Sequence, residues 1–304
     1  MVRLRLWPAA ASALAFAFAL GAPAMAGAGP RAAAEPVTAP GALALPALRG
    51  DLSLAQPLRL RLAKGVHADP LWSQAGLYAN LPRAFAGLTG VEATGPAIYD
   101  PNSQSWYAGS RGAIVRVEQG GRLAVLADGV HGRDIDVRGT AGVAVSREPD
   151  DTIALVRFAE RGKALATPVR SVLLRGEQFF EPRLSPDGNS VLVAESRAQG
   201  GHFWLVDLAG KARDLGQGYG AVWHPDGKRI VFMRISHDGY RVTASELWVH
   251  DIASGREQLL GATPGIAEVE PSVSPDGRWI AYGDALTGEL CIAAFPKTAS
   301  GGER

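Results

Sequence analysis

From about residue 52 onward, short apolar runs alternate with clusters of turn-forming residues, and no long helical periodicity interrupts them. Apolar runs bounded by Gly, Pro, Asn and Asp are typical of β-strands. The chain has 37 Gly and 20 Pro in 304 residues, which suits many turns better than long helices. The pattern therefore predicts an all-β domain.

Three copies of one template occur in the second half of the chain. Each copy is an apolar strand, a Pro-Asp-Gly turn and a second apolar strand, and the turn aspartates are Asp187, Asp226 and Asp276. Proline presets φ for such a turn, aspartate hydrogen-bonds the backbone beyond it, and glycine adopts the left-handed conformation. We interpret the three aspartates as turn-formers, because a catalytic residue need not recur in every repeat.

The spacing of the copies predicts a β-propeller. The turn aspartates are 39 and 50 residues apart, and weaker copies of the template begin near Asp69, Pro96 and Arg133. Repeats of roughly 40 residues with about four short strands each are the signature of propeller blades. Together the copies predict six blades over residues 51–298, with five as the alternative because the first copy is short. Residues 299–304 are expected to be a disordered tail.

The Ser-Pro-Asp-Gly copies resemble the WD40-like propeller repeat of the TolB family. In that repeat an acidic residue and a proline open the inner strand, as Glu181-Pro182 and Glu270-Pro271 do here. The resemblance implies a propeller. We expect it to lack the amino-terminal α/β domain that usually precedes the propeller in TolB, because only about 40 residues of the mature chain lie ahead of the first copy. The first half, with Gly112-Ala-Ile-Val-Arg116, also resembles sugar-lactonase and NHL-type propellers. The two relatives agree on fold and differ in function.

The amino terminus predicts export. Residues 1–26 combine two early arginines, an apolar stretch and a small-x-small cleavage site, as a secretory signal peptide does. The apolar stretch is shorter than the roughly 20 residues that a spanning helix needs. Residues 27–50 are rich in Ala, Pro and Gly and are expected to be flexible. We therefore expect a periplasmic or secreted protein, without a transmembrane anchor after cleavage.

Charge and motifs exclude several functions. A net charge of +1 leaves no basic excess for nucleic acid. The chain has no phosphate-binding loop, no nucleophile elbow and no His-Glu-x-x-His zinc motif. Its one cysteine, Cys291, lies in an apolar run and is expected to be buried and inert. We expect a monomer.

The candidate site is a ring of residues at one mouth of the propeller channel. Inner strands line that channel, and the residue six positions before each turn aspartate would begin an inner strand. In chain order, the strong and weak copies place at this position Asp69, Pro96, Arg133, Glu181, Gly220 and Glu270.

Such a ring could hold a cation, a water cluster or a basic partner segment. The alternative is a solvated ring that is partly neutralised because Arg133 pairs with Glu181 or Glu270. Exposed ion pairs of this kind contribute little to stability. His67 lies two positions ahead of Asp69 and would add a group that titrates near neutrality.

Two functions remain open. The TolB resemblance, the export signal and the missing catalytic motifs favour a non-enzymatic module that binds an envelope protein or peptide and needs no cofactor. The lactonase resemblance implies instead a metal-dependent hydrolase with a divalent metal at the channel. In that alternative Asp69, Glu181 and Glu270 would be ligands, and calcium is the candidate ion.

Overall fold

In the computed structural model, every element that the described residues form is a β-strand, and there are 22 such strands. All of their pairings are antiparallel. The all-β expectation is confirmed. The described residues are 43–63, 68–73, 76–79, 98–100, 105–110, 112–117, 123–132, 134–160, 163–198, 200–238, 242–261 and 263–296.

The strands form one two-stranded sheet and five four-stranded sheets, consistent with propeller blades. The first sheet holds β2 (Leu71–Ser73) and β3 (Gly76–Tyr78). The second holds β4 (Ile98–Asp100), β5 (Ser105–Ser110), β6 (Ala113–Val117) and β7 (Leu123–Asp128). The third holds β8 (Ile135–Arg138), β9 (Val143–Arg147), β10 (Thr152–Glu160) and β11 (Lys163–Arg175).

The remaining three sheets come from the second half of the chain and from one early strand. The fourth holds β12 (Phe179–Leu184), β13 (Ser190–Arg197), β14 (Gly200–Asp207) and β15 (Ala212–Gln217). The fifth holds β16 (Tyr219–Trp223), β17 (Arg229–His237), β18 (Val242–Asp251) and β19 (Glu257–Gly261). The sixth holds β20 (Glu268–Val273), β21 (Trp279–Asp284), β22 (Leu290–Ala294) and β1 (Leu58–Leu60).

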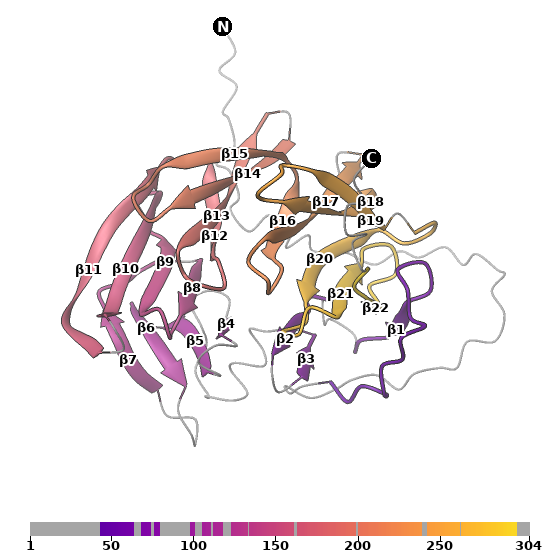
Figure 1. The fold of residues 1–304 in the computed structure, drawn as a ribbon, viewed down its shortest axis with the longest axis horizontal. Helices are drawn as coiled ribbons and strands as arrows, with labels where there is room; N and C mark the ends of the chain where they lie inside the picture. The colour runs from indigo at the N-terminus through magenta and orange to yellow at the C-terminus, as the bar shows by residue number, and fades with distance from the viewer. Residues whose placement is uncertain are drawn as a thin grey trace, which may run out of the picture.

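The sheets follow one another around a common centre, with the first strand of each sheet on the inside (Figure 1). Strand β2 contacts β4, β4 contacts β8 and β8 contacts β12, while β13 contacts β16, β16 contacts β20 and β20 contacts β2 again. The sequence of contacts therefore returns to its start. This order gathers the inner strands, which are far apart in the chain, around one centre.

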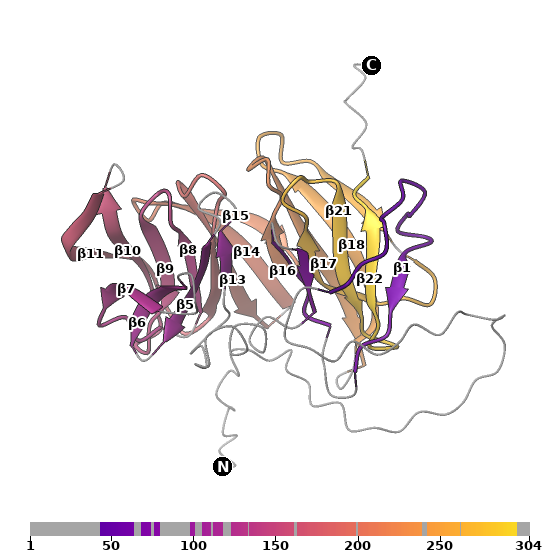
Figure 2. The ribbon, with the colours of Figure 1, turned by 90° about the horizontal axis from the view of Figure 1, so that it is seen from below.

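The early strand β1 completes the last sheet. It pairs with β22, with Arg59 opposite Cys291, and the two strands lie side by side at one end of Figure 2. The carboxylate of Asp284, which is buried, accepts from the Arg59 guanidinium and from the Thr287 hydroxyl. Residues from both ends of the described chain are thus joined in one sheet.

Alternation along each strand places the core between neighbouring sheets. On β13, Val191 and Val193 pack with Leu155 of the preceding sheet. Leu192, between them, packs with Phe232 of the following sheet. Each four-stranded sheet therefore buries both faces, so that adjacent sheets supply each other's core.

The Pro-Asp-Gly turns have the predicted geometry. The Asp187 carboxylate accepts from the Ser185 hydroxyl and from the Asn189 backbone N–H. Gly188 has φ of 73°. The interpretation of these aspartates as turn-formers is confirmed.

The structure also tests the expectations for Cys291 and for residues 27–50. Cys291 is buried, and burial raises the pKa of its thiol to about 12, as expected for an inert cysteine. Leu43, within the segment expected to be flexible, is buried and its N–H bonds to the Leu77 carbonyl at 2.7 Å. The last part of that segment therefore packs on the first sheet.

The signal peptide at residues 1–26 and the tail at 299–304 lie outside the described residues. None of the residues that the structure describes forms a helix that is long and apolar enough to cross a membrane.

Candidate functional site at the channel mouth

Three of the predicted ring carboxylates belong to inner strands or to the residues just before them. Glu181 lies on β12, Glu270 on β20, and Asp69 two residues before β2, where its N–H bonds to the Ala79 carbonyl. Arg133 and His67 lie outside the described residues, as does Pro96.

The three strong copies share an unusual backbone at the predicted ring position. Glu181 has φ of 48°, Gly220 has φ of 55° and Glu270 has φ of 51°. In each strand this residue falls within a register shift of the inner strand against its neighbour. Such a bulge takes the side chain out of the regular ladder and re-aims it.

The left-handed conformation is natural for Gly220 but costly for glutamate. For an L-residue with a Cβ it costs about 1–2 kcal/mol. Only three described residues other than glycine have positive φ, and Glu181 and Glu270 are two of them. The copies thus retain one backbone shape, and two of them retain it with a carboxylate side chain.

The carboxyl groups from three different sheets influence one another. Burial, together with the charges of Asp69 and Glu181 and against the opposing charge of Arg183, raises the pKa of Glu270 to about 8. Burial likewise raises the pKa of Glu181, with Asp69 adding to the rise and Arg183 lowering it. The structure therefore brings Asp69, Glu181 and Glu270 into one electrostatic cluster.

The counter-charge of this cluster is Arg183. Burial alone would lower the pKa of its guanidinium, but the charges of Glu181, Asp136, Asp134 and Asp69 raise it overall, so Arg183 stays charged. Its Nη1 donates to the Pro182 carbonyl at 3.2 Å. Its own carbonyl accepts from Trp223 Nε1 of the next sheet at 3.0 Å.

Asp134 is a fourth carboxyl group of the cluster. Its Oδ2 accepts from the Glu181 backbone N–H at 3.5 Å, a long hydrogen bond, and its charge raises the pKa of Glu181. The group of Asp69, Asp134, Glu181, Glu270 and Arg183 is called the mouth cluster below.

The sequence-based prediction missed Arg183 and Asp134. Residues two positions apart on a strand commonly have their side chains on one face. The spacing between Glu181 and Arg183 was therefore the sequence signal that could have identified Arg183. The prediction placed Arg133 as the cation of the ring. In the described part of the chain, Arg183 has that place.

The strand that carries Glu181 and Arg183 is held by the preceding sheet. Asp136 Oδ2 accepts from the Leu184 N–H at 2.7 Å, and Arg138 Nη2 donates to the Leu184 carbonyl at 2.6 Å. Asp136 and Arg138 also form an ion pair at 2.8 Å, with Asp136 buried. These contacts hold the inner strand β12 against β8, and β12 carries Glu181 and Arg183 of the mouth cluster.

The mouth cluster has an excess of acid. The cluster contains four carboxyl groups and one guanidinium, and burial favours the protonated form of Glu270. Among the described residues, no group of three or more His, Cys, Asp or Glu is arranged to hold a metal ion. The carboxyl oxygens of the arrangement can accept hydrogen bonds from ammonium or guanidinium groups.

No family model matches the chain. An uncharacterized protein of Agrobacterium fabrum is 30% identical over 114 residues, which cover 36% of this chain and 37% of that protein. The alignment therefore spans little more than a third of that relative.

Solved structures resemble the chain more broadly. A protein from Agrobacterium tumefaciens assigned as TolB is 20% identical, with a TM-score of 0.43 over 59% of this chain and 66% of that one. TolB from Acinetobacter baumannii is 16% identical, with a TM-score of 0.38 over 74% and 53%. Oligogalacturonate lyase from Vibrio parahaemolyticus is 14% identical, with a TM-score of 0.42 over 61% and 55%.

The expected similarity to TolB propellers is confirmed as a structural likeness. At these TM-scores and identities the likeness carries no argument about activity, partner or site. The chain also spans only part of each of these structures.

Proposed function

We propose that this chain is an exported, TolB-like β-propeller that binds a protein or peptide partner at the mouth cluster without catalysing a reaction. The observation that carries the proposal is the pair Glu181 and Glu270. Both are held at positive φ, and burial raises the pKa of both. Strained backbone and perturbed titratable groups lower stability and concentrate at functional sites.

The charge of the mouth cluster favours a cationic partner segment. A lysine or arginine side chain entering the channel would meet the carboxylates of Asp69, Asp134 and Glu181, and would favour ionisation of Glu270. Charge-assisted hydrogen bonds of this kind are about twice as strong as neutral ones. The partner we infer is therefore an envelope protein or peptide that presents a basic side chain.

Six blades and a monomeric state belong to the same proposal. Six sheets whose contacts return to the first sheet support six blades instead of five. Export rests on the signal-like residues 1–26, and a periplasmic or secreted location follows from them.

The experiment compares capture by matched variants. Residues 27–304 are immobilised and exposed to an envelope extract, as the wild type and as the double variant Glu181→Gln with Glu270→Gln. The control double variant is Glu160→Gln with Glu177→Gln, which removes two carboxylates that are exposed elsewhere. We expect the mouth variant to lose a partner that the wild type and the control retain.

Two outcomes would contradict the proposal. One is capture of the same proteins by all three forms, and the other is no capture by the wild type at several salt concentrations. Melting temperatures of all three forms must be measured alongside, since loss of folding would also abolish capture. The lactonase-type alternative has no observation among the described residues that favours it.

A further inference from the structure

The chain contains five Asp-Gly pairs, and the structure describes both residues of four of them. An aspartate that precedes glycine can react with its own main chain, because glycine has no Cβ that would shield the attacking nitrogen. The four described pairs are Asp128-Gly129, Asp187-Gly188, Asp226-Gly227 and Asp276-Gly277. The last three are the turns of the strong copies, whereas Asp128 ends the outer strand β7.

Asp128 and Gly129 hold their reacting groups close together. The Gly129 N–H donates to Asp128 Oδ1 at 2.9 Å. A carbon–oxygen bond is about 1.2 Å long, so the side-chain carbon Cγ lies within about 4 Å of this nitrogen. Two groups react readily when their reacting atoms are about 3–3.5 Å apart, so only a small adjustment separates this pair from a productive geometry.

The surroundings of Asp128 and Gly129 leave room for that adjustment. Both residues are exposed. Gly129 has φ of 70°, and nothing lies within 4 Å of the position that a Cβ would take. Among the described residues, no donor other than the Gly129 N–H bonds to the Asp128 carboxylate. Neither reacting group is therefore held by the rest of the fold.

In the three turn pairs the same groups are held by other partners. The Asp187 carboxylate accepts from the Ser185 hydroxyl and from the Asn189 N–H. Each turn glycine donates its N–H to the carbonyl three residues earlier, with Gly188 bonded to Ser185 at 2.9 Å, Gly227 to His224 at 3.0 Å and Gly277 to Ser274 at 2.8 Å. The hydrogen bonds that shape these turns thus direct the N–H away from the neighbouring carboxylate.

We propose that Asp128 is a site of spontaneous main-chain modification, at which the Gly129 nitrogen attacks the Asp128 carboxyl group and the link becomes an isoaspartyl bond. The nitrogen loses its proton and bonds to Cγ, while the protonated carboxyl group loses its hydroxyl, so that one water leaves and a succinimide ring closes. Water then opens the ring. Its attack at Cγ restores aspartate, and its attack at the main-chain carbonyl leaves the chain joined through Cγ. No other reagent is needed.

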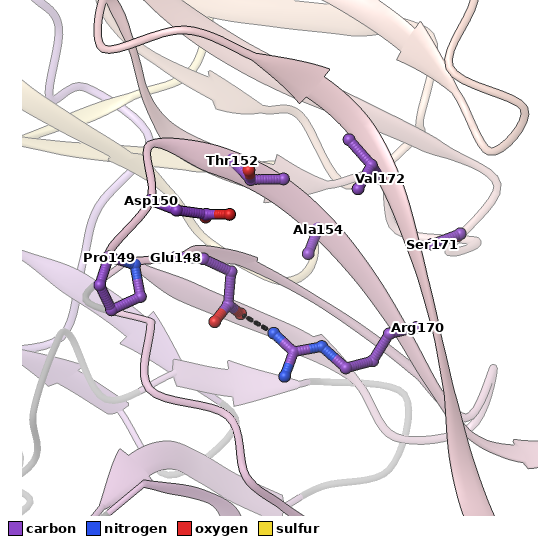
Figure 3. Close-up of a pocket in the computed structure, with 8 residues that line it drawn as sticks. All are labelled: Glu148, Pro149, Asp150, Thr152, Ala154, Arg170, Ser171 and Val172. Atoms are coloured by element: carbon purple, nitrogen blue, oxygen red, sulfur yellow. Dashed lines mark ion pairs between the residues drawn. The ribbon is translucent and has the colours of Figure 1, made fainter.

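The modification would alter a contact between two sheets. The Gly129 carbonyl accepts from Arg170 of β11 at 2.8 Å, and the following N–H, of Val130, bonds to the Gly112 carbonyl at 2.8 Å. Arg170 also pairs with Glu148 at 2.7 Å, beside the shallow pocket in Figure 3. An isoaspartyl bond adds one carbon to the main chain just before Gly129, so we expect Arg170 to lose the carbonyl and keep the ion pair. The site is independent of the mouth cluster.

The test follows the uptake of heavy oxygen from the solvent. Residues 27–304 are kept in ¹⁸O-labelled water at 37 °C and pH 7.4 for about four weeks and are then digested in ordinary water. Each opening of a succinimide adds one ¹⁸O and so raises the mass of that peptide by 2 Da. Trypsin places the four described Asp-Gly pairs in four different peptides. The three turn pairs are therefore controls within the same molecule.

We expect the Asp128 peptide to gain label at least about tenfold faster than each turn peptide, which corresponds to a barrier that is ~1.4 kcal/mol lower. Electron-transfer fragmentation, which distinguishes isoaspartate from aspartate, should find isoaspartate at position 128. The variant Asp128→Glu should gain no label in this peptide, because its longer side chain would have to close a six-membered ring.

A second incubation in concentrated guanidinium chloride tests whether the fold causes the preference. In the unfolded chain the turn hydrogen bonds are lost, so the four peptides should gain label at similar rates. Equal labelling of Asp128 and the turn pairs in the folded protein would overturn the proposal. So would a preference for Asp128 that persists in the denaturant, because the neighbouring sequence and not the structure would then select the site.

Discussion

The Arg59 guanidinium lies 2.6 Å from the Asp284 carboxylate, and this ion pair joins two residues that are 225 positions apart. Asp284 is fully buried at its side chain, whereas Arg59 is 19% exposed. Arg59 also pairs with Glu289 at 2.6 Å. β1 has only 3 residues, and these ion pairs join it to the last sheet in addition to its pairing with β22 and the packing of Leu58 and Leu60.

We predict that Arg59→Ala destabilises the fold by about 3 kcal/mol, because removing one partner leaves a buried carboxylate without its counter-charge. The measurement is urea unfolding followed by tryptophan fluorescence. The matched control is Arg278→Ala, since Arg278 also pairs with an aspartate at 2.6 Å but its side chain is 76% exposed. The control should lose under about 1 kcal/mol. Equal losses in the two variants would show that the Arg59 pair has no special role in closure.

The second prediction concerns pH. The pKa of Glu270 is about 8 in the folded chain against an ordinary value of 4.5. Between these values the folded chain holds a proton that the unfolded chain has released, so this group's contribution to stability falls as pH rises from 4.5 to 8. The slope from one such group is at most about 1.4 kcal/mol per pH unit.

Glu270→Gln removes this slope. We expect the difference in unfolding free energy between Glu270→Gln and wild type to grow in favour of the variant from pH 5 to pH 8.5, and to level off above. Urea unfolding at four pH values measures it, with Glu177→Gln as the exposed control. A difference that does not change with pH would mean that Glu270 titrates normally.

Repetition made the position of the mouth cluster predictable but not its chemistry. The three strong copies share turn geometry, so counting back from Asp187 and Asp276 finds Glu181 and Glu270 without any structure. Positive φ at these residues was not predictable, because that conformation is expected of glycine. The sequence indicated this positive φ only through Gly220, which occupies the equivalent position in the middle copy.

Closure of the ring by an early strand was predictable. The apolar residues within 52–65 could supply a strand missing from the last blade, whose outer strand is poorly marked after Phe295, and β1 does pair with β22. The ion pair between Arg59 and Asp284 had no local signal, because nothing in either neighbourhood indicates the other. Arg183 was missed for a different reason. The prediction followed only the residue six positions before each turn aspartate, which is Glu181 in β12, whereas Arg183 lies two positions further along the same strand.

The third prediction tests Arg183 as the counter-charge of the mouth cluster. Arg183→Met would leave the carboxyl groups of Asp69, Asp134 and Glu181 without their cation. We expect a loss of about 3 kcal/mol at pH 8, and a smaller loss at pH 5, because the raised pKa of Glu181 leaves more of its carboxyl group protonated there. Arg183→Lys, which keeps the charge, should recover part of the stability at pH 8. A loss that is the same at both pH values would indicate a packing role for the side chain instead.

The last prediction separates stability from binding at Glu181. Glycine adopts φ of 48° without strain, so Glu181→Gly removes both a strained backbone position and a desolvated carboxyl group. We expect it to stabilise the fold by about 1 kcal/mol, net of the added freedom of the unfolded chain.

The control is Ala221→Gly on β16. Ala221 is not among the described non-glycine residues with positive φ, so glycine there should destabilise by about 0.5–1 kcal/mol. Partner capture by Glu181→Gly should be lost even though the protein is more stable. A variant that is both more stable and fully able to capture the partner would show that the strained glutamate is not retained for binding.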